Sequence, residues 1–210
     1  MQVQSFKQLV LLVIAFCSIS CEEGKFITSW MKTTNTIYPY RKILVIAIVN
    51  DSLNPVRMQL EDRVTDGLNS YGYQAVSALR RYGPRGLSKM GEENMFLHLN
   101  DEEIDAVMAV VLIDNGRDSI LNANKTKDFS PTYFYDRLWQ YKDIAAEFSA
   151  DDHVKTSFSW EVLFFELPTL EPRCNLRTVP FRSKALFHIT DAIPDDIIQH
   201  LTKEKIIKRM

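Results

Sequence analysis

The sequence predicts an α/β fold: a single domain whose mixed sheet is begun by a βαβ unit, with a later antiparallel hairpin and flanking helices. An unbroken apolar, β-branched run over 42–49 is typical of a strand buried on both faces. An amphipathic helix over 54–71 and a second strand over 73–78 follow it, and this order predicts a parallel pair with a right-handed crossover. Two later apolar runs, 156–167 and 174–181, are separated by a short Pro-containing loop, as in a hairpin.

The helix over 54–71 has clear start and stop signals. Asn54 is the expected N-cap, and Pro55 takes the first helical position, where its missing N–H costs nothing. Gly72 ends the helix because glycine readily adopts a positive φ. Its apolar residues form one stripe at steps of three and four: Val56, Leu60, Val64, Leu68 and Tyr71.

The remaining elements extend the sheet and cover it. A short helix over 95–105 leads into a third strand over 106–113, which is again continuously apolar. A closing helix is expected within 191–208, packing on the sheet over 193–207, with Pro194 and the acidic pair Asp195–Asp196 in its first turn.

The first 21 residues predict export. Lys7 supplies a positive charge, and the apolar run 9–16 follows it. The small residues Ser18 and Ser20 then stand directly before Cys21. The apolar run is about half of the roughly 20 residues needed to span a bilayer, which disfavours a permanent transmembrane helix.

Two interpretations of the cleavage site compete. Ordinary signal peptidase accepts Ser18 and Ser20 at the positions before the cut. The same cut makes Cys21 the first mature residue, where a bacterial lipoprotein carries its thioether-linked diacylglycerol. Ser18 departs from the usual Leu of such sites. We favour lipidation of Cys21; under the alternative it is an incidental cysteine, free to pair with Cys174.

These features divide the chain into a signal peptide (1–20), a lipid-anchored tether (21–40) and an α/β domain (41–210). The tether lacks a sustained period and is rich in Thr and Ser, with Trp30 as a residue that could dock on the domain. Without residues 1–20 the chain has 24 basic and 27 acidic residues, so its charge is near neutral and mixed in sign. No basic stripe indicates a nucleic-acid partner.

Candidate chemistry gives no catalytic residue, metal site or cofactor. The histidines lie in four different segments and none has metalloprotease spacing: His98, His153, His188 and His200. The acidic run 101–103 is explained by a helix N-terminus, whose partial positive charge favours carboxylates. The glycines of 83–91 form a turn, since they lack the Lys and Ser/Thr of a P-loop. Arg57 and Glu61, four residues apart, are interpreted as an exposed ion pair worth a few tenths of a kcal/mol.

The segment 129–141 is dense in aromatic residues and is the candidate binding surface. Such a group could recognise a glycan, a peptide or a partner protein. The alternative, which we favour, is a long connection that packs its rings over an open sheet face. The residues concerned are Phe129, Tyr133, Phe134, Tyr135, Trp139 and Tyr141.

Several segments together resemble a known group of proteins. These are the signal and cysteine, Ser29-Trp30, the strand from Arg41, the Arg57…Glu61 pair, Gln74–Ser77 with Pro84, and Trp160–Glu166. The chain resembles a family of Bacteroidota-type envelope lipoproteins of unknown function, whose domain is similar to the N-terminal domain of TolB. Family members tend to have a Trp in the second hairpin strand, where this chain has Arg173-Cys174-Asn175-Leu176. The resemblance implies a fold and a location and supplies no catalytic residues.

The resulting functional hypothesis is an exported, lipid-anchored envelope protein that acts as a non-enzymatic binding or scaffold module. Its expected partners are the membrane, through the N-terminal lipid, and an envelope protein or glycan. We place it in the cell envelope and favour the outer membrane over the inner membrane. The alternatives are an enzyme acting on an envelope polymer and a purely structural lipoprotein.

Overall fold

The computed structural model describes residues 26–31, 40–114, 157–169, 171–182 and 185–210. The strands are β1 (Phe26–Met31), β2 (Lys42–Ile48), β3 (Gln74–Ser77), β4 (Ala106–Asp114), β5 (Ser157–Glu166), β6 (Glu171–Thr178) and β7 (Phe181–Arg182). The helices are α2 (Asn54–Ser70), α3 (Ala78–Tyr82), α4 (Glu92–Asp101) and α7 (Leu186–Lys203), with 3-10 turns η1 (Asp51–Leu53) and η2 (Leu87–Lys89).

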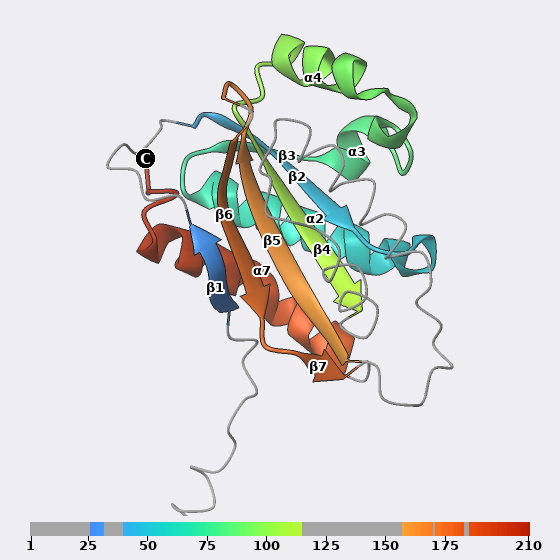
Figure 1. The fold of residues 1–210 in the computed structure, drawn as a ribbon, viewed down its shortest axis with the longest axis vertical. Coiled ribbons are helices and arrows are strands. Elements are labelled where there is room, and N and C mark those ends of the chain that lie inside the picture. Colours follow the sequence, from blue (N-terminus) through green and yellow to red (C-terminus); the bar gives the residue numbers. More distant parts are fainter. Residues whose placement is uncertain (1–25, 32–39, 115–156, 170, 183–184) are drawn as a thin grey trace, which may run out of the picture.

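The described strands form one mixed sheet in the order β1-β6-β5-β4-β2-β3, and β7 pairs with β5 beyond the end of β6 (Figure 1). β2 runs parallel to both β3 and β4, whereas the β4–β5, β5–β6 and β6–β1 pairs are antiparallel. The predicted α/β class, the parallel βαβ start and the later hairpin are therefore confirmed.

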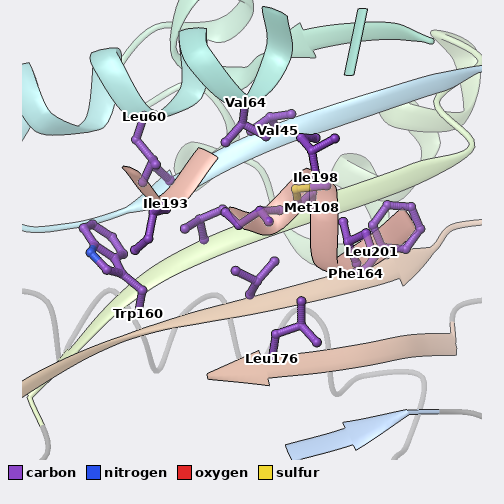
Figure 2. Packing of buried hydrophobic residues seen from close by; sticks show 14 of the residues in the cluster. Val45, Leu60, Val64, Met108, Trp160, Phe164, Leu176, Ile193, Ile198 and Leu201 are labelled. Carbon is purple, nitrogen blue, oxygen red and sulfur yellow. The ribbon is translucent and has the colours of Figure 1, made fainter. Parts of the chain in front are cut away.

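The two faces of the sheet have separate cores, because neighbouring residues of a strand point to opposite faces. In β2, Ile43 and Val45 join the core under α2 and α7, whereas Leu44 and Ile46 join the opposite core with residues of α3 and α4. β2 is thus covered on both faces, as its continuous apolar run predicts. Figure 2 shows the first core, in which Leu60 and Val64 of α2 meet Ile193 and Ile198 of α7 over the strands.

The two long helices lie side by side on one face of the sheet, and Gly67 sits at their contact. A Cβ built on Gly67 would lie 3.1 Å from Cγ1 of Ile198, so α2 and α7 approach closely there. Closer to the N-terminus of α2, the side chains of Gln59 and Arg63 donate hydrogen bonds to Asp191 of α7. Four residues of the predicted stripe are buried, whereas Tyr71 is the C-cap of α2 and is only partly buried; the four are Val56, Leu60, Val64 and Leu68.

The start predicted for the closing helix is wrong. α7 begins at Leu186, so Pro194 lies inside it and the pair Asp195–Asp196 follows in its middle rather than in its first turn. The apolar series that reaches Ile193 starts earlier, with Leu186 and Ile189, and all three are buried. Burial of this face outweighs the one backbone hydrogen bond that Pro194 cannot donate.

The first strand lies inside the segment predicted to be a tether over 21–40. Phe26–Met31 pairs antiparallel with β6, with an irregularity between Thr28 and Trp30. The prediction is wrong for these residues, because a short run of Phe, Ile and Thr suffices for an edge strand once a neighbouring strand offers its hydrogen bonds. Phe26 is therefore the first residue of the sheet in the described part of the chain.

Truncating Leu60 to Ala should destabilise the domain strongly, since its side chain is fully buried in the α2–α7 core. We expect a loss of about 2–5 kcal/mol in the free energy of unfolding, measured by urea denaturation. Leu97→Ala is the matched control, because Leu97 is 56% exposed on α4. It should change stability by no more than about 0.5 kcal/mol. Equal losses in both variants would contradict the core described above.

Candidate functional site

A shallow groove of about 470 Å³ lies beside β3, at the junction of α2, β3 and α3. β3 is an edge strand of the sheet, so its outer side forms one wall of the groove. Both acidic and basic side chains line it, and its residues are Asp62, Thr65, Asp66, Ala75, Val76, Ser77, Arg80 and Arg81. This is the candidate functional site in the described part of the chain.

The junction beneath the groove is organised by the carboxylate of Glu61, which is fully buried. Its Oε1 accepts hydrogen bonds from the backbone N–H of Ala47 and from Nε of Arg57, both at 3.0 Å. Its Oε2 accepts from the Ser77 hydroxyl at 2.6 Å and from the backbone N–H of Leu79 at 2.7 Å. A buried carboxylate is tolerated only when donors surround it, and here four donors do so.

Each donor comes from a different part of the junction. The backbone N–H groups of β2 point alternately toward its two neighbouring strands. Pairing with β3 ends at Val45, so the N–H of Ala47, which lies beyond that point, has no β3 residue to pair with. Glu61 accepts that N–H in place of the missing strand. It also accepts the N–H of Leu79 in the first turn of α3, where Ser77 is the N-cap. Glu61 thus fixes where β3 stops and α3 starts.

The interpretation of Arg57 and Glu61 as an exposed ion pair is wrong. The pair exists at 3.0 Å, but the side chain of Glu61 is 0% exposed and that of Arg57 only 12%. Arg57 also donates from Nη1 to the carbonyl of Pro84, at 3.1 Å. A spacing of four residues predicts that the two side chains are neighbours on a helix, but it does not tell whether they are buried. The available signal was the position of Glu61 next to Leu60 and one turn before Val64, at the border of the apolar stripe.

Asn69 completes the pairing of β3 on its outer side. Its side-chain Oδ1 accepts the N–H of Ala75 at 2.7 Å, and its Nδ2 donates to the carbonyl of the same residue at 3.5 Å. The amide therefore occupies the position that a further strand would take. A partner strand can add to this edge only by displacing Asn69, which is how proteins protect sheet edges.

Ion pairs hold the charged side chains around the groove. Arg80 donates from two nitrogens to both carboxylate oxygens of Asp62, a bidentate contact that raises the pKa of the guanidinium. Arg81 donates to Glu102 at 3.1 Å, and the Tyr82 hydroxyl donates to the same oxygen at 3.1 Å. These charges satisfy one another, so the groove is nearly neutral and suited to reversible polar contacts.

Glu102 has the most contacts in this cluster, since Nε2 of His98 also lies 3.2 Å from its Oε1. Partial burial alone would raise the pKa of Glu102. The hydrogen bonds from Arg81 and Tyr82 and the charge of Arg81 outweigh it and hold the pKa below its ordinary value. Burial, and then the charge of Glu102, raise the pKa of Tyr82 to about 12. The His98 ring also stacks edge-on against that of Tyr82, with the ring centroids 5.5 Å apart.

None of the sequence-predicted candidate residues that the structure describes lines the groove. Cys21 and the six aromatic residues of 129–141 lie outside the described residues, as does His153. His188 is exposed on the first turn of α7, and His200 lies near its end, with its ring 6.2 Å from that of Phe26. A turn was predicted over 83–91 and no helix before it, so α3 and its groove residues Arg80 and Arg81 were missed.

Three residues of the hairpin segment 173–176 are buried, and Asn175 is partly buried. Arg173 pairs with Glu166 of β5, and both side chains are at most 4% exposed. Cys174 is fully buried, and that burial raises the pKa of its thiol to about 12. Cys174 is a free cysteine in this structure and, as a neutral thiol, a poor nucleophile.

Within the described residues no group of three His, Cys, Asp or Glu side chains is placed to hold a metal ion. Over the same residues, no helix has the length and apolar character needed to cross a membrane.

The comparisons with known proteins match the fold only loosely. No family model and no curated protein matches the chain. Among solved structures, a PelC variant dodecamer from Paraburkholderia phytofirmans is similar with 9% identity and a TM-score of 0.41, over 83% of this chain and 97% of that one. A second PelC dodecamer from the same organism has 7% identity and a TM-score of 0.39, over 83% and 96%. At these values the likeness does not bear on function.

Replacing Glu61 with Gln should destabilise the fold, because one acceptor oxygen becomes an NH₂ that faces donors. We expect a loss of about 2–4 kcal/mol in the free energy of unfolding, from unsatisfied N–H groups and the partly buried charge of Arg57. Urea denaturation measures it, with Glu93→Gln at an exposed site of α4 as the matched control. A loss of only a few tenths of a kcal/mol would restore the exposed-pair interpretation.

The Glu102 carboxylate should contribute a pH-dependent stability. Its folded pKa is lowered, so its contribution is complete above its ordinary pKa of 4.5 and is lost as the pH falls through the lower folded value. Glu102→Gln should therefore be less stable than the parent at pH 7, and the difference should shrink progressively below about pH 4.5. Urea denaturation at a series of pH values measures this; a difference that is constant with pH would contradict it.

Proposed function

We propose that this chain is an exported, lipid-anchored envelope protein whose α/β domain acts as a non-enzymatic binding or scaffold module. The observation that carries the proposal is Cys21, which directly follows a charged, then apolar, then small-residue segment typical of a lipoprotein signal. An acylated Cys21 would join the membrane to a strand that begins at Phe26.

The geometry of the described domain supports binding rather than covalent chemistry. Three of the four charged side chains that line the groove are in ion pairs, Arg80–Asp62 and Arg81–Glu102. The Cys174 thiol is buried and neutral. Thr65 lines the groove, and its buried Oγ1 has no hydrogen-bond partner among the described residues.

The partners that we propose are the membrane, through the lipid, and an envelope protein or glycan. The proposed location is the cell envelope, with the outer membrane favoured over the inner membrane. Kinship with the Bacteroidota-type lipoprotein family, which has a TolB-like domain, remains part of this proposal. The aromatic surface of 129–141 remains a second candidate for the binding site.

Metabolic labelling with an alkyne fatty acid tests the anchor. The full chain, expressed in a Gram-negative bacterium, should incorporate the label and sediment with the membranes. Cys21→Ala should lose the label entirely, whereas the matched control Cys174→Ala should keep it, because the Cys174 side chain is buried. An unlabelled parent chain, or label that survives Cys21→Ala, would overturn the lipoprotein proposal.

A further inference from the structure

The distance between the proposed anchor and the fold is short. Only residues 22–25 separate Cys21 from the first residue of β1. The five steps from the Cα of Cys21 to the Cα of Phe26, even fully extended, span about 18 Å. If Cys21 is acylated, as the proposed function holds, the start of β1 must lie within roughly that distance of the lipid headgroups. The domain then has no long tether to clear the membrane, and one end of it faces the bilayer.

The strand pairing identifies that end. Phe26 pairs with Thr178, so the start of β1 lies beside the end of β6. The chain then continues through Val179 and Pro180 into β7, and α7 starts shortly after it. Figure 1 shows the start of β1, β7 and the end of β6 together at the lower end of the sheet. We call this region, represented by Val179, Arg182 and Phe187, the anchor end.

The anchor end exposes apolar side chains that the fold does not use. Val179 is 47% exposed and Phe187 is 64% exposed, the largest exposure among the large hydrophobic side chains of the described residues. Arg182 of β7 is exposed between them in the sequence. Exposed apolar and basic side chains within one short stretch of the chain suit the boundary between acyl chains and anionic headgroups.

We propose that the anchor end rests on the membrane, with Val179 and Phe187 in the headgroup region and Arg182 beside anionic lipid. The lipid brings this end to the surface, and the apolar side chains then fix the orientation of the domain. β3 lies at the sheet edge opposite β1, about 24 Å away across five strand spacings. The groove beside β3 therefore lies at the edge of the sheet that is farthest from the anchor.

Depth-dependent quenching tests this orientation in the full chain. Phe187→Cys, and separately Leu97→Cys as the matched control on α4, are expressed in a Gram-negative bacterium and purified from its membranes. Each new thiol is labelled with a small fluorophore, which the buried Cys174 should not accept. The proteins are reconstituted into vesicles of phosphatidylethanolamine and phosphatidylglycerol that contain a headgroup-proximal spin-labelled lipid.

The fluorophore at 187 should be quenched at least threefold more than the fluorophore at 97. Equal quenching at the two positions, in protein that carries the lipid, would overturn the proposed orientation and leave the anchor intact. Protein that never reaches the membrane fraction would instead contradict both proposals, because the orientation depends on the anchor. Phe187→Ser in a chain labelled at Val179→Cys should lower the quenching at 179; no change there would also count against membrane contact by this end.

Discussion

The fold depends on the buried carboxylate of Glu61 and on the donors that surround it. A charge removed from water must be satisfied on both oxygens, and the four donors come from β2, α2, β3 and α3. The carboxylate therefore holds β2, β3 and α3 at fixed places relative to α2. Through Arg57 the constraint extends to the carbonyl of Pro84, in the segment that follows α3. No apolar contact could impose this geometry, because apolar packing has no direction.

The same constraint explains why the sheet stops at β3. α2 supplies Glu61 to the N–H of Ala47, beyond the end of β3, and Asn69 to the outer side of Ala75. Side chains of α2 thus take the place of a neighbouring strand at Ala47 and at Ala75. The edge of the sheet at β3 is protected in this way, and the groove lies beside it. The opposite edge is β1, near the proposed anchor. Anchor and groove lie at opposite edges of one sheet, an arrangement suited to a module that is held on a surface and open to a partner.

Much of the fold could be predicted from the sequence, because apolar runs and helix signals are local. β2, α2 and β4 follow from their own residues, and the parallel order follows from chirality. Three features could not be predicted in this way. β1 depends on hydrogen bonds offered by β6, and α7 continues through Pro194 because its buried face compensates for the lost bond. Glu61 has the same spacing from Arg57 as a solvent-exposed pair, and only the tertiary fold removes it from water. The groove combines residues of three elements and has no local signal.

Native-state hydrogen exchange at Ala47 and Leu79 tests the role of Glu61 most directly. Both N–H groups donate to its carboxylate rather than to a strand or helix partner. If that carboxylate holds the junction together, these two amides should exchange only through global unfolding, with the same free energy as the core amide of Val45. Exchange of Ala47 and Leu79 through a local opening, at a free energy several kcal/mol below that of Val45, would contradict the account.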